Sequence, residues 1–275
     1  MDIARPDRKR KKKQLQRIVW SGVAAILVFA VCLALWLESR HHRTYVTVTH
    51  NGRTIQVLVD LPRVNNKASV VILVHEIYGL SDWAKGMADE LADKGFIVVA
   101  PDLLSGYGPK GGGYSDFASE REVVSAVSSL DPDIVLADLD AVVDFGRNIA
   151  ASNGKIAVVG FSWGGWKSFD FATHRKDLSA VFVFYGTGPA DVTTINAPVY
   201  GFYGGNDGEV TGSVPATTDA MKAAGKFYDP VTYEGASHGF MRLGDDFLSS
   251  SHANRTARNQ AFARLVTLLR EMGAH

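Results

Sequence analysis

The chain has 275 residues, of which 46% are hydrophobic and 21% are charged. This composition is typical of a globular protein with one sizeable core, in one large domain or two small ones. The formal net charge is zero, but residues 1–40 carry nine Lys or Arg against three Asp or Glu, and the remainder carries 20 against 26. A mildly acidic body gives no electrostatic basis for binding nucleic acid. Cys32 is the single cysteine, which excludes an internal disulfide and, in the body, a cysteine nucleophile or a CxxC metal site.

The N-terminal region contains an uncharged apolar run of 20 residues, from Ile18 to Leu37. As a helix it would be roughly 30 Å long, which matches the hydrocarbon core of a bilayer. Trp20 and Trp36 lie near its two ends, where indole rings favour the membrane interface. The sequence therefore predicts a basic tail at 1–17, a transmembrane anchor at 18–37, a juxtamembrane linker at 38–42 and a body at 43–275.

The charge of the tail predicts the orientation of this anchor. The tail carries eight Lys or Arg against two Asp, and basic flanks stay in the cytoplasm. We therefore expect a single-pass protein of a bacterial inner membrane, with its body facing the periplasm or the exterior. A cleaved signal peptide is the alternative, but the end of the run, CLALWLESR, is a poor cleavage site. A buried helix of the body would not need the basic flank.

The body alternates between strand and helix patterns. It opens with a hairpin, because alternating β-branched residues flank Asn51-Gly52, a dipeptide favoured in tight turns. Strands are then expected at 69–75, 96–102, 155–161, 178–186, 197–205 and 226–234, and helices near 82–94, between 117 and 150, from about 164, near 213–225 and over 253–272. Strands that are apolar on both faces and separated by helices predict an α/β fold, with a mostly parallel sheet and helices on both of its faces.

A glycine-rich loop at 106–114 is the one segment that suggests a phosphate-binding site. It lacks the Lys-Ser/Thr ending of such a loop, and no strand runs directly into it. We expect a mobile loop over a site instead. The sequence implies no metal and no organic cofactor.

The segment KIAVVGFSWGGWKSF carries the strongest chemical signal. It reads as a buried strand, then Gly160-Phe161-Ser162-Trp163-Gly164, then a helix, which is the structural setting of the G-x-S-x-G motif. The turn is so sharp that the residues two before and two after the serine must lack side chains. Ser162 is therefore the candidate nucleophile, at the carboxyl end of a strand and at a helix N-terminus that favours negative charge. A glycine-rich turn with an incidental serine is the alternative.

A serine nucleophile needs a histidine as base and an acid that orients this histidine, and in the fold that carries this motif both follow the serine, the acid first. Among the later histidines, only His238 falls in a loop directly after a predicted strand. Asp207 follows the strand at 197–205 and is the candidate acid, with Asp191 as the alternative. Asp229 begins a strand and would lie at the wrong end of the sheet.

Five motifs in the body share a pattern with a known family. They are HEIYGL (75–80), APDLLSGYG (100–108), GFSWGG (160–165), GGNDGEV (204–210) and YEGASHGF (233–240). In this order they resemble the dienelactone hydrolase family of α/β hydrolases, over most of residues 55–272. The resemblance implies an α/β-hydrolase fold and hydrolysis of an ester or lactone.

The resemblance also implies roles for further residues. It places a carboxylate, Glu76, beside the nucleophile, and it pairs the backbone N–H groups of Ile77 and Trp163 as an oxyanion hole. Two backbone donors on rigid turns are what a tetrahedral oxyanion needs. The founding enzymes use cysteine where this chain has Ser162, so the role of Glu76 is open here.

The founding enzymes also bind a substrate carboxylate with two arginines. Arg242 matches one of them, and Arg121 falls within one position of the other. Surface salt bridges are the alternative role for both. Tyr78, in the loop that carries Glu76, is a further candidate for substrate contact.

Together these patterns predict a membrane-anchored serine hydrolase that cleaves a small-molecule ester or lactone through an acyl-enzyme. A broad acyl esterase or a peptidase could use the same triad. A non-catalytic binding module on a hydrolase fold is the non-enzymatic alternative, although Ser162, Asp207 and His238 form a complete set.

Overall fold

The structure is a computed structural model that describes residues 20, 22, 26–30, 41–246, 248 and 251–274. Contacts divide the chain into two units, residues 1–40 and residues 41–275. Most of the predicted anchor lies outside the described residues. Within the described ranges, no helix is both long enough and apolar enough to cross a membrane. The second unit, residues 41–275, is built around one sheet.

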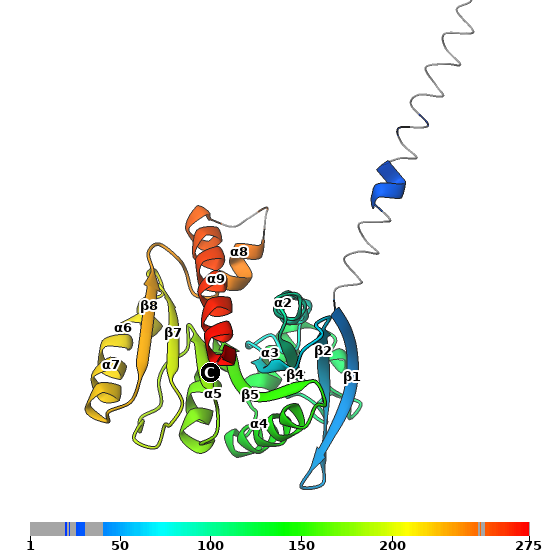
Figure 1. The fold of residues 1–275 in the computed structure, drawn as a ribbon. Coiled ribbons are helices and arrows are strands. Elements are labelled where there is room, and N and C mark those ends of the chain that lie inside the picture. The colour runs from blue at the N-terminus through cyan, green and yellow to red at the C-terminus, as the bar shows by residue number, and fades with distance from the viewer. Residues whose placement is uncertain are drawn as a thin grey trace, which may run out of the picture. The chain divides into compact units, whose positions relative to one another are not determined.

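Its centre is an eight-stranded sheet in the order β1-β2-β4-β3-β5-β6-β7-β8 (Figure 1). The strands are β1 (His41–His50), β2 (Arg53–Pro62), β3 (Ala68–Val74), β4 (Ile97–Pro101), β5 (Ser152–Phe161), β6 (Ala180–Phe184), β7 (Val199–Gly204) and β8 (Tyr228–Tyr233). β2 pairs antiparallel with β1 and β4, and every other pairing is parallel. The expected hairpin at Asn51-Gly52 and the mostly parallel sheet are thus confirmed.

Helices cover both faces of this sheet, as the apolar strands require. They are α2 (Asp82–Asp93), α3 (Glu120–Ser128), α4 (Pro132–Arg147), α5 (Trp163–His174), α6 (Gly208–Gly212), α7 (Val214–Ala223), α8 (Phe240–Asp245) and α9 (His252–Ala274). Buried side chains of α3, α4, α5 and α7 join one core, and those of α2, α8 and α9 join the core on the opposite face. Because β3 and β5 lie buried between the two layers, the loops at their carboxyl ends are held by rigid elements.

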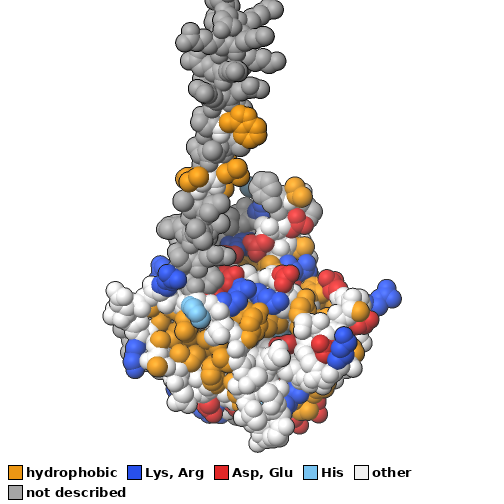
Figure 2. Space-filling model, turned by 90° about the vertical axis from the view of Figure 1, so that its right-hand side faces the viewer, with side chains coloured by type: hydrophobic (Ala, Val, Ile, Leu, Met, Phe, Trp, Pro, Cys, Tyr) orange, Lys and Arg blue, Asp and Glu red, His pale blue; other side chains and the backbone are white. Residues whose placement is uncertain are grey.

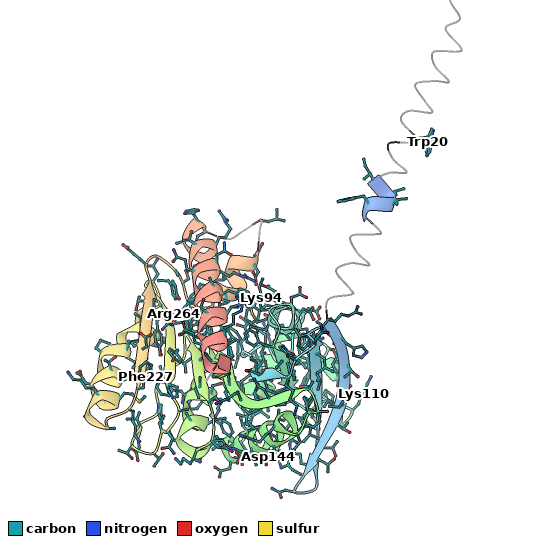
Figure 3. The ribbon with its side chains drawn as sticks, in the orientation of Figure 1. Trp20, Lys94, Lys110, Asp144, Phe227 and Arg264 are labelled. Atoms are coloured by element: carbon teal, nitrogen blue, oxygen red, sulfur yellow. The ribbon has the colours of Figure 1, made fainter. Side chains whose placement is uncertain are left out.

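The last helix is fixed to the sheet by one arginine as well as by its apolar face. Arg264 of α9, labelled in Figure 3, donates to the carbonyl oxygen of Gly201 on β7 at 3.1 Å and pairs with Asp229 on β8 at 2.9 Å.

Figure 2 views the side of the molecule that carries β1 and β2, where hydrophobic side chains lie exposed between charged ones. Tyr45 on β1, which is 55% exposed, is one of the large exposed apolar residues of the chain.

Two short helices, α6 and α8, were not expected from the sequence. Each has five or six residues, which is too short for a 3.6-residue hydrophobic period to be visible. Both follow site residues directly: α6 begins after Asp207, and α8 begins two residues after His238. They turn the chain sharply at the carboxyl end of the sheet.

Candidate active site

Ser162 lies at the turn between β5 and α5, in a conformation that few side chains adopt. Its φ is 53° and its ψ is −115°, and strained backbone of this kind is concentrated at functional sites. Its N–H donates to the carbonyl oxygen of Phe184 at 2.9 Å, which ties the turn to the end of β6. The Ser162 side chain is therefore held at the carboxyl edge of the sheet.

The glycines on both sides of this turn are sterically required. A Cβ at Gly160 would lie 2.1 Å from the carbonyl oxygen of Gly164, and a Cβ at Gly164 would lie 2.3 Å from that of His75. Real Cβ atoms do not approach backbone this closely. Because Gly164 packs against the end of β3, the start of α5 lies beside the loop at 75–80.

The structure brings Ser162, His238 and Asp207 together from three separate loops. The Ser162 Oγ lies 2.7 Å from the His238 Nε2, and the His238 Nδ1 lies 2.6 Å from the Asp207 Oδ2. Asp207 is 8% exposed, whereas the His238 side chain is 47% exposed. A buried carboxylate at Nδ1 favours the tautomer with its proton there, which leaves Nε2 as an acceptor for the serine proton.

The alternative residues lie elsewhere. Asp191 is exposed, and its Oδ1 accepts hydrogen bonds from the N–H and hydroxyl of Thr193, which lower the pKa of Asp191. Asp229 pairs with Arg264. His174 ends α5 and His252 begins α9, while His275 lies outside the described residues.

Two backbone N–H groups near the nucleophile turn were expected to act as donors. Trp163 is the first residue of α5, and Ile77 follows β3 in the loop against which that helix packs. Neither N–H donates to another group in the described part of the chain. An N–H at a helix N-terminus has no partner within the helix, which leaves the Trp163 N–H free to donate to a ligand.

Glu76 is buried beside these donors and forms an ion pair with Arg242. The Arg242 Nε lies 2.6 Å from the Glu76 Oε1, and Glu76 is 2% exposed whereas Arg242 is 37% exposed. Burial raises the pKa of Glu76, and the arginine acts in the opposite direction. The Arg242 guanidinium also lies over the ring of Tyr78, 4.5 Å from its centroid. The structure thus brings Glu76, Tyr78 and Arg242 together.

Arg121 does not join this group. It lies on the exposed first turn of α3, and it forms no hydrogen bond or ion pair with the site residues in the part of the chain that the structure describes. Its proposed contact with substrate stays a prediction. The described residues also contain no group of three or more His, Cys, Asp or Glu that could hold a metal ion.

Two site residues were missed from the sequence. Tyr185 follows β6 with a φ of 40°, and its buried ring lies 5.1 Å from the His238 ring, in an edge-on contact. His75 is buried, its ring stacks on the Trp163 indole at 5.7 Å, and its Nδ1 lies 2.9 Å from the carbonyl oxygen of Glu76. Burial lowers the pKa of His75. An apolar strand followed by a lone tyrosine or histidine is too common a pattern to indicate such contacts.

Comparisons with known proteins agree with this architecture. The family model of the dienelactone hydrolase family matches residues 55–273. A relative in Escherichia coli (strain K12), named "Putative carboxymethylenebutenolidase", is 30% identical over 218 residues, which cover 74% of this chain and 77% of the relative. The carboxymethylenebutenolidase of Pseudomonas putida is 27% identical over 226 residues, or 78% of this chain and 92% of that enzyme.

A solved structure shows the same fold. It is that of a dienelactone hydrolase-like promiscuous phosphotriesterase from metagenomic libraries, with a TM-score of 0.70, 21% identity, and coverage of 85% of this chain and 99% of that one. The eight-stranded, mostly parallel sheet covered by helices is that of the α/β hydrolases. The chain is therefore a member of the dienelactone hydrolase family.

Proposed function

We propose that this chain is a serine hydrolase that cleaves a carboxylic ester or lactone through an acyl-enzyme. The observation that carries the proposal is the continuous contact from Ser162 through His238 to Asp207, at 2.7 and 2.6 Å. Hydrogen-bond reach between nucleophile, base and orienting acid is the geometric signature of an activated serine. Membership of a hydrolase family supports the same reaction class.

The proposed reaction has two steps. The Ser162 Oγ attacks the carbonyl carbon while its proton passes to the His238 Nε2, and this proton then protonates the leaving alcohol oxygen as the ester bond breaks. In the second step His238 takes a proton from water, the hydroxide oxygen attacks the acyl carbon, and Ser162 leaves with the proton. Asp207 keeps its charge and stabilises the imidazolium that forms in each step.

The N–H groups of Ile77 and Trp163 stabilise the oxyanion in this proposal. Charge develops on the carbonyl oxygen only in the tetrahedral intermediate, so preorganised donors lower the barrier. Losing one such donor typically costs about 10²- to 10³-fold in kcat. His75 supports this pair, because it packs on Trp163 and contacts the carbonyl oxygen between Glu76 and Ile77. Glu76 is proposed to act through Arg242, as a buried carboxylate that holds the guanidinium beside Tyr78.

A fluorophosphonate probe tests this proposal against a non-catalytic binding module. The probe should label the wild-type chain and leave Ser162→Ala unlabelled. His238→Ala should also lose labelling. A chain that resists labelling while correctly folded would be a binding module. A panel of lactones, short-chain p-nitrophenyl esters and peptide anilides then separates an ester or lactone hydrolase from a peptidase.

The proposed triad also predicts how its mutations combine. Ser162→Ala and His238→Ala should each lower kcat by about 10⁴-fold or more, with little further loss in the double variant, because the residues act as a unit. Independent losses that multiply in the double variant would contradict a shared mechanism.

We further propose that residues 18–37 anchor the chain in a bacterial inner membrane, with the body outside the cytoplasm. The uncharged run and the basic tail support this proposal. Protease added to intact spheroplasts should digest the body and spare a small anchored fragment. Complete protection of the body in sealed cells, with digestion after lysis, would reverse the orientation.

A further inference from the structure

A cavity of about 330 Å³ opens beside the loop that carries the proposed oxyanion donor Ile77. Its wall begins at Tyr78, the next residue along, and continues over the segment at 114–120 and the first turns of α3. This volume is at the lower end of the range for ligand pockets, so it can hold a substituent of a substrate.

The cavity adjoins the charged pair of the site. The Tyr78 ring that forms its wall carries the Arg242 guanidinium on its face, and Arg242 pairs with Glu76. Glu120, on the cavity wall, lies close enough to Glu76 that its charge helps to raise the pKa of Glu76. A substrate whose carbonyl oxygen meets Ile77 can therefore extend past Tyr78 towards Glu120.

The charge of this cavity is negative. Nine residues line it, all within the described part of the chain, and Glu120 is the one charged residue among them. Arg121, the neighbouring cation on α3, is not part of the lining. Two other cations near the lining have carboxylate partners: Arg242 pairs with Glu76 at 2.6 Å, and Lys85 with Asp82 at 3.2 Å.

Two helix N-termini also border the cavity, and their partial positive charge could favour an anion instead. Ser81 and Ser119 cap α2 and α3, and each accepts an N–H of its own helix. The first turn of α3 holds two carboxylates, of Glu120 and Glu122. The same turn also carries Arg121, and both Arg121 and Glu122 lie outside the lining. The charge on the wall itself is therefore that of Glu120, a full charge against about half an elementary charge at each terminus.

Aromatic rings supply the remaining recognition. Tyr78, Tyr114 and Phe117 contribute to the lining. Cations of the protein occupy one face of two of these rings, so an alkylammonium group would have to use the faces that they leave free. The Arg242 guanidinium lies 4.5 Å from the Tyr78 centroid, and the Lys85 Nζ lies 5.3 Å from the Tyr114 centroid. A pocket that combines aromatic faces with one carboxylate has the chemistry that recognises alkylammonium groups.

We propose that this cavity binds a positively charged alkylammonium substituent of the ester substrate, and that Glu120 and Tyr78 select for it. The inference rests on the proposed hydrolase function and adds its substrate class. It runs opposite to the anionic preference that two substrate-binding arginines would produce, because Glu120 and not Arg121 faces the cavity.

The test uses thioacetates of matched thiols that carry three different terminal groups. Each thiol carries a terminal trimethylammonium, tert-butyl or carboxylate group on a spacer of two or four methylenes, and thiol release is followed with a thiol-reactive dye. A solvent-exposed ion pair and one cation–π contact together are worth about 3- to 30-fold. We expect kcat/KM for the cationic substrate to exceed that for its neutral analogue by this factor at low ionic strength.

Glu120→Gln should lower the ratio of cationic to neutral kcat/KM by the share of the ion pair, about 1.4- to 5-fold, and the share of the cation–π contact should remain. Glu122→Gln is the matched control on the same helix: it removes the same charge outside the lining and keeps the acceptor that Glu122 offers to the Ala118 N–H. This control should retain the ratio. A ratio near unity in wild type, a preference for the carboxylate substrate, or equal effects of the two variants would overturn the proposal.

Binding separates this inference from the proposed chemistry. Calorimetry with Ser162→Ala and the intact thioacetates should show tighter binding of the cationic member by the same factor, whether or not wild type turns it over. Tight binding of the cationic thioacetate without turnover in wild type would contradict the proposed hydrolase function and support the proposed alkylammonium site. Turnover of all three substrates, with equal binding affinities, would contradict the proposed alkylammonium site and support the proposed hydrolase function.

Discussion

Replacing Asp207 by asparagine changes the proposed triad without changing its shape. The Asp207 Oδ2 lies 2.6 Å from the His238 Nδ1, and the carboxylate is 8% exposed. Losing a charge-assisted hydrogen bond in such a setting costs about 1.5–3 kcal/mol. This alone corresponds to roughly a 10- to 150-fold loss in rate.

The amide adds a second penalty. Its N–H₂ can donate to Nδ1, which places the imidazole proton on Nε2, where it faces Ser162 and cannot accept the serine proton. The same substitution in the chymotrypsin triad lowers kcat by about 10⁴-fold, or about 5.5 kcal/mol. Because the contacts from Ser162 to Asp207 have the same order and lengths within hydrogen-bond reach, we expect a loss of about this size here.

The assay compares kcat/KM for p-nitrophenyl acetate in Asp207→Asn and Asp191→Asn, with circular dichroism as the check on folding. Asp191 is exposed and bonded to Thr193, so its isosteric variant should stay within about 2-fold of wild type. A harmless Asp207→Asn together with an inactive Asp191→Asn would refute the reasoning and assign the acid to the loop after β6.

Three further predictions concern stability and organisation. Gly164→Ala should lower the free energy of unfolding by about 3 kcal/mol or more, because its Cβ would lie 2.3 Å from a carbonyl oxygen. Gly86→Ala, whose Cβ would have nothing within 4 Å, should raise the free energy of unfolding by about 0.5–1 kcal/mol. Similar urea midpoints for the two variants would contradict the steric argument. Because burial lowers the pKa of His75, its stabilising share is complete above the ordinary histidine pKa of about 6.5 and is lost as the pH falls below it. The urea midpoint of wild type should therefore drop more between pH 7.5 and 5.5 than that of His75→Phe. Equal drops in the two proteins would exclude His75 as a source of the pH dependence of stability. A chain that begins at residue 41, where β1 starts, should be soluble and within a few-fold of full activity, which gel filtration and kcat/KM would check.

The fold could be predicted because its helices and strands are visible in local sequence patterns. Strands buried on both faces are continuous apolar runs, and the helices between them have a polar side. The succession of β3 to β8 along the chain therefore followed from the sequence. The hairpin at Asn51-Gly52 followed from turn chemistry. The short helices α6 and α8 did not, because five or six residues hold too little of a helical period.

The sequence by itself determined which residues could form the nucleophile turn. Gly160, Ser162 and Gly164 are constrained by backbone sterics within one strand–turn–helix unit, and such constraints are local. The sequence favoured Asp207 over Asp191 as the candidate acid, although both follow strands at the same edge of the sheet. Only the tertiary structure shows that Asp207 contacts His238, whereas Asp191 is bonded to Thr193.

The tertiary structure also decided the surroundings of Ser162. It paired Arg242 with Glu76, placed the Tyr185 ring against His238, and put Glu120 rather than Arg121 on the wall of the cavity. These contacts join residues far apart in the chain, or depend on the rotation of one helix by a single residue. Neither kind of information is present in local sequence patterns, because it is set by how complete elements pack against one another.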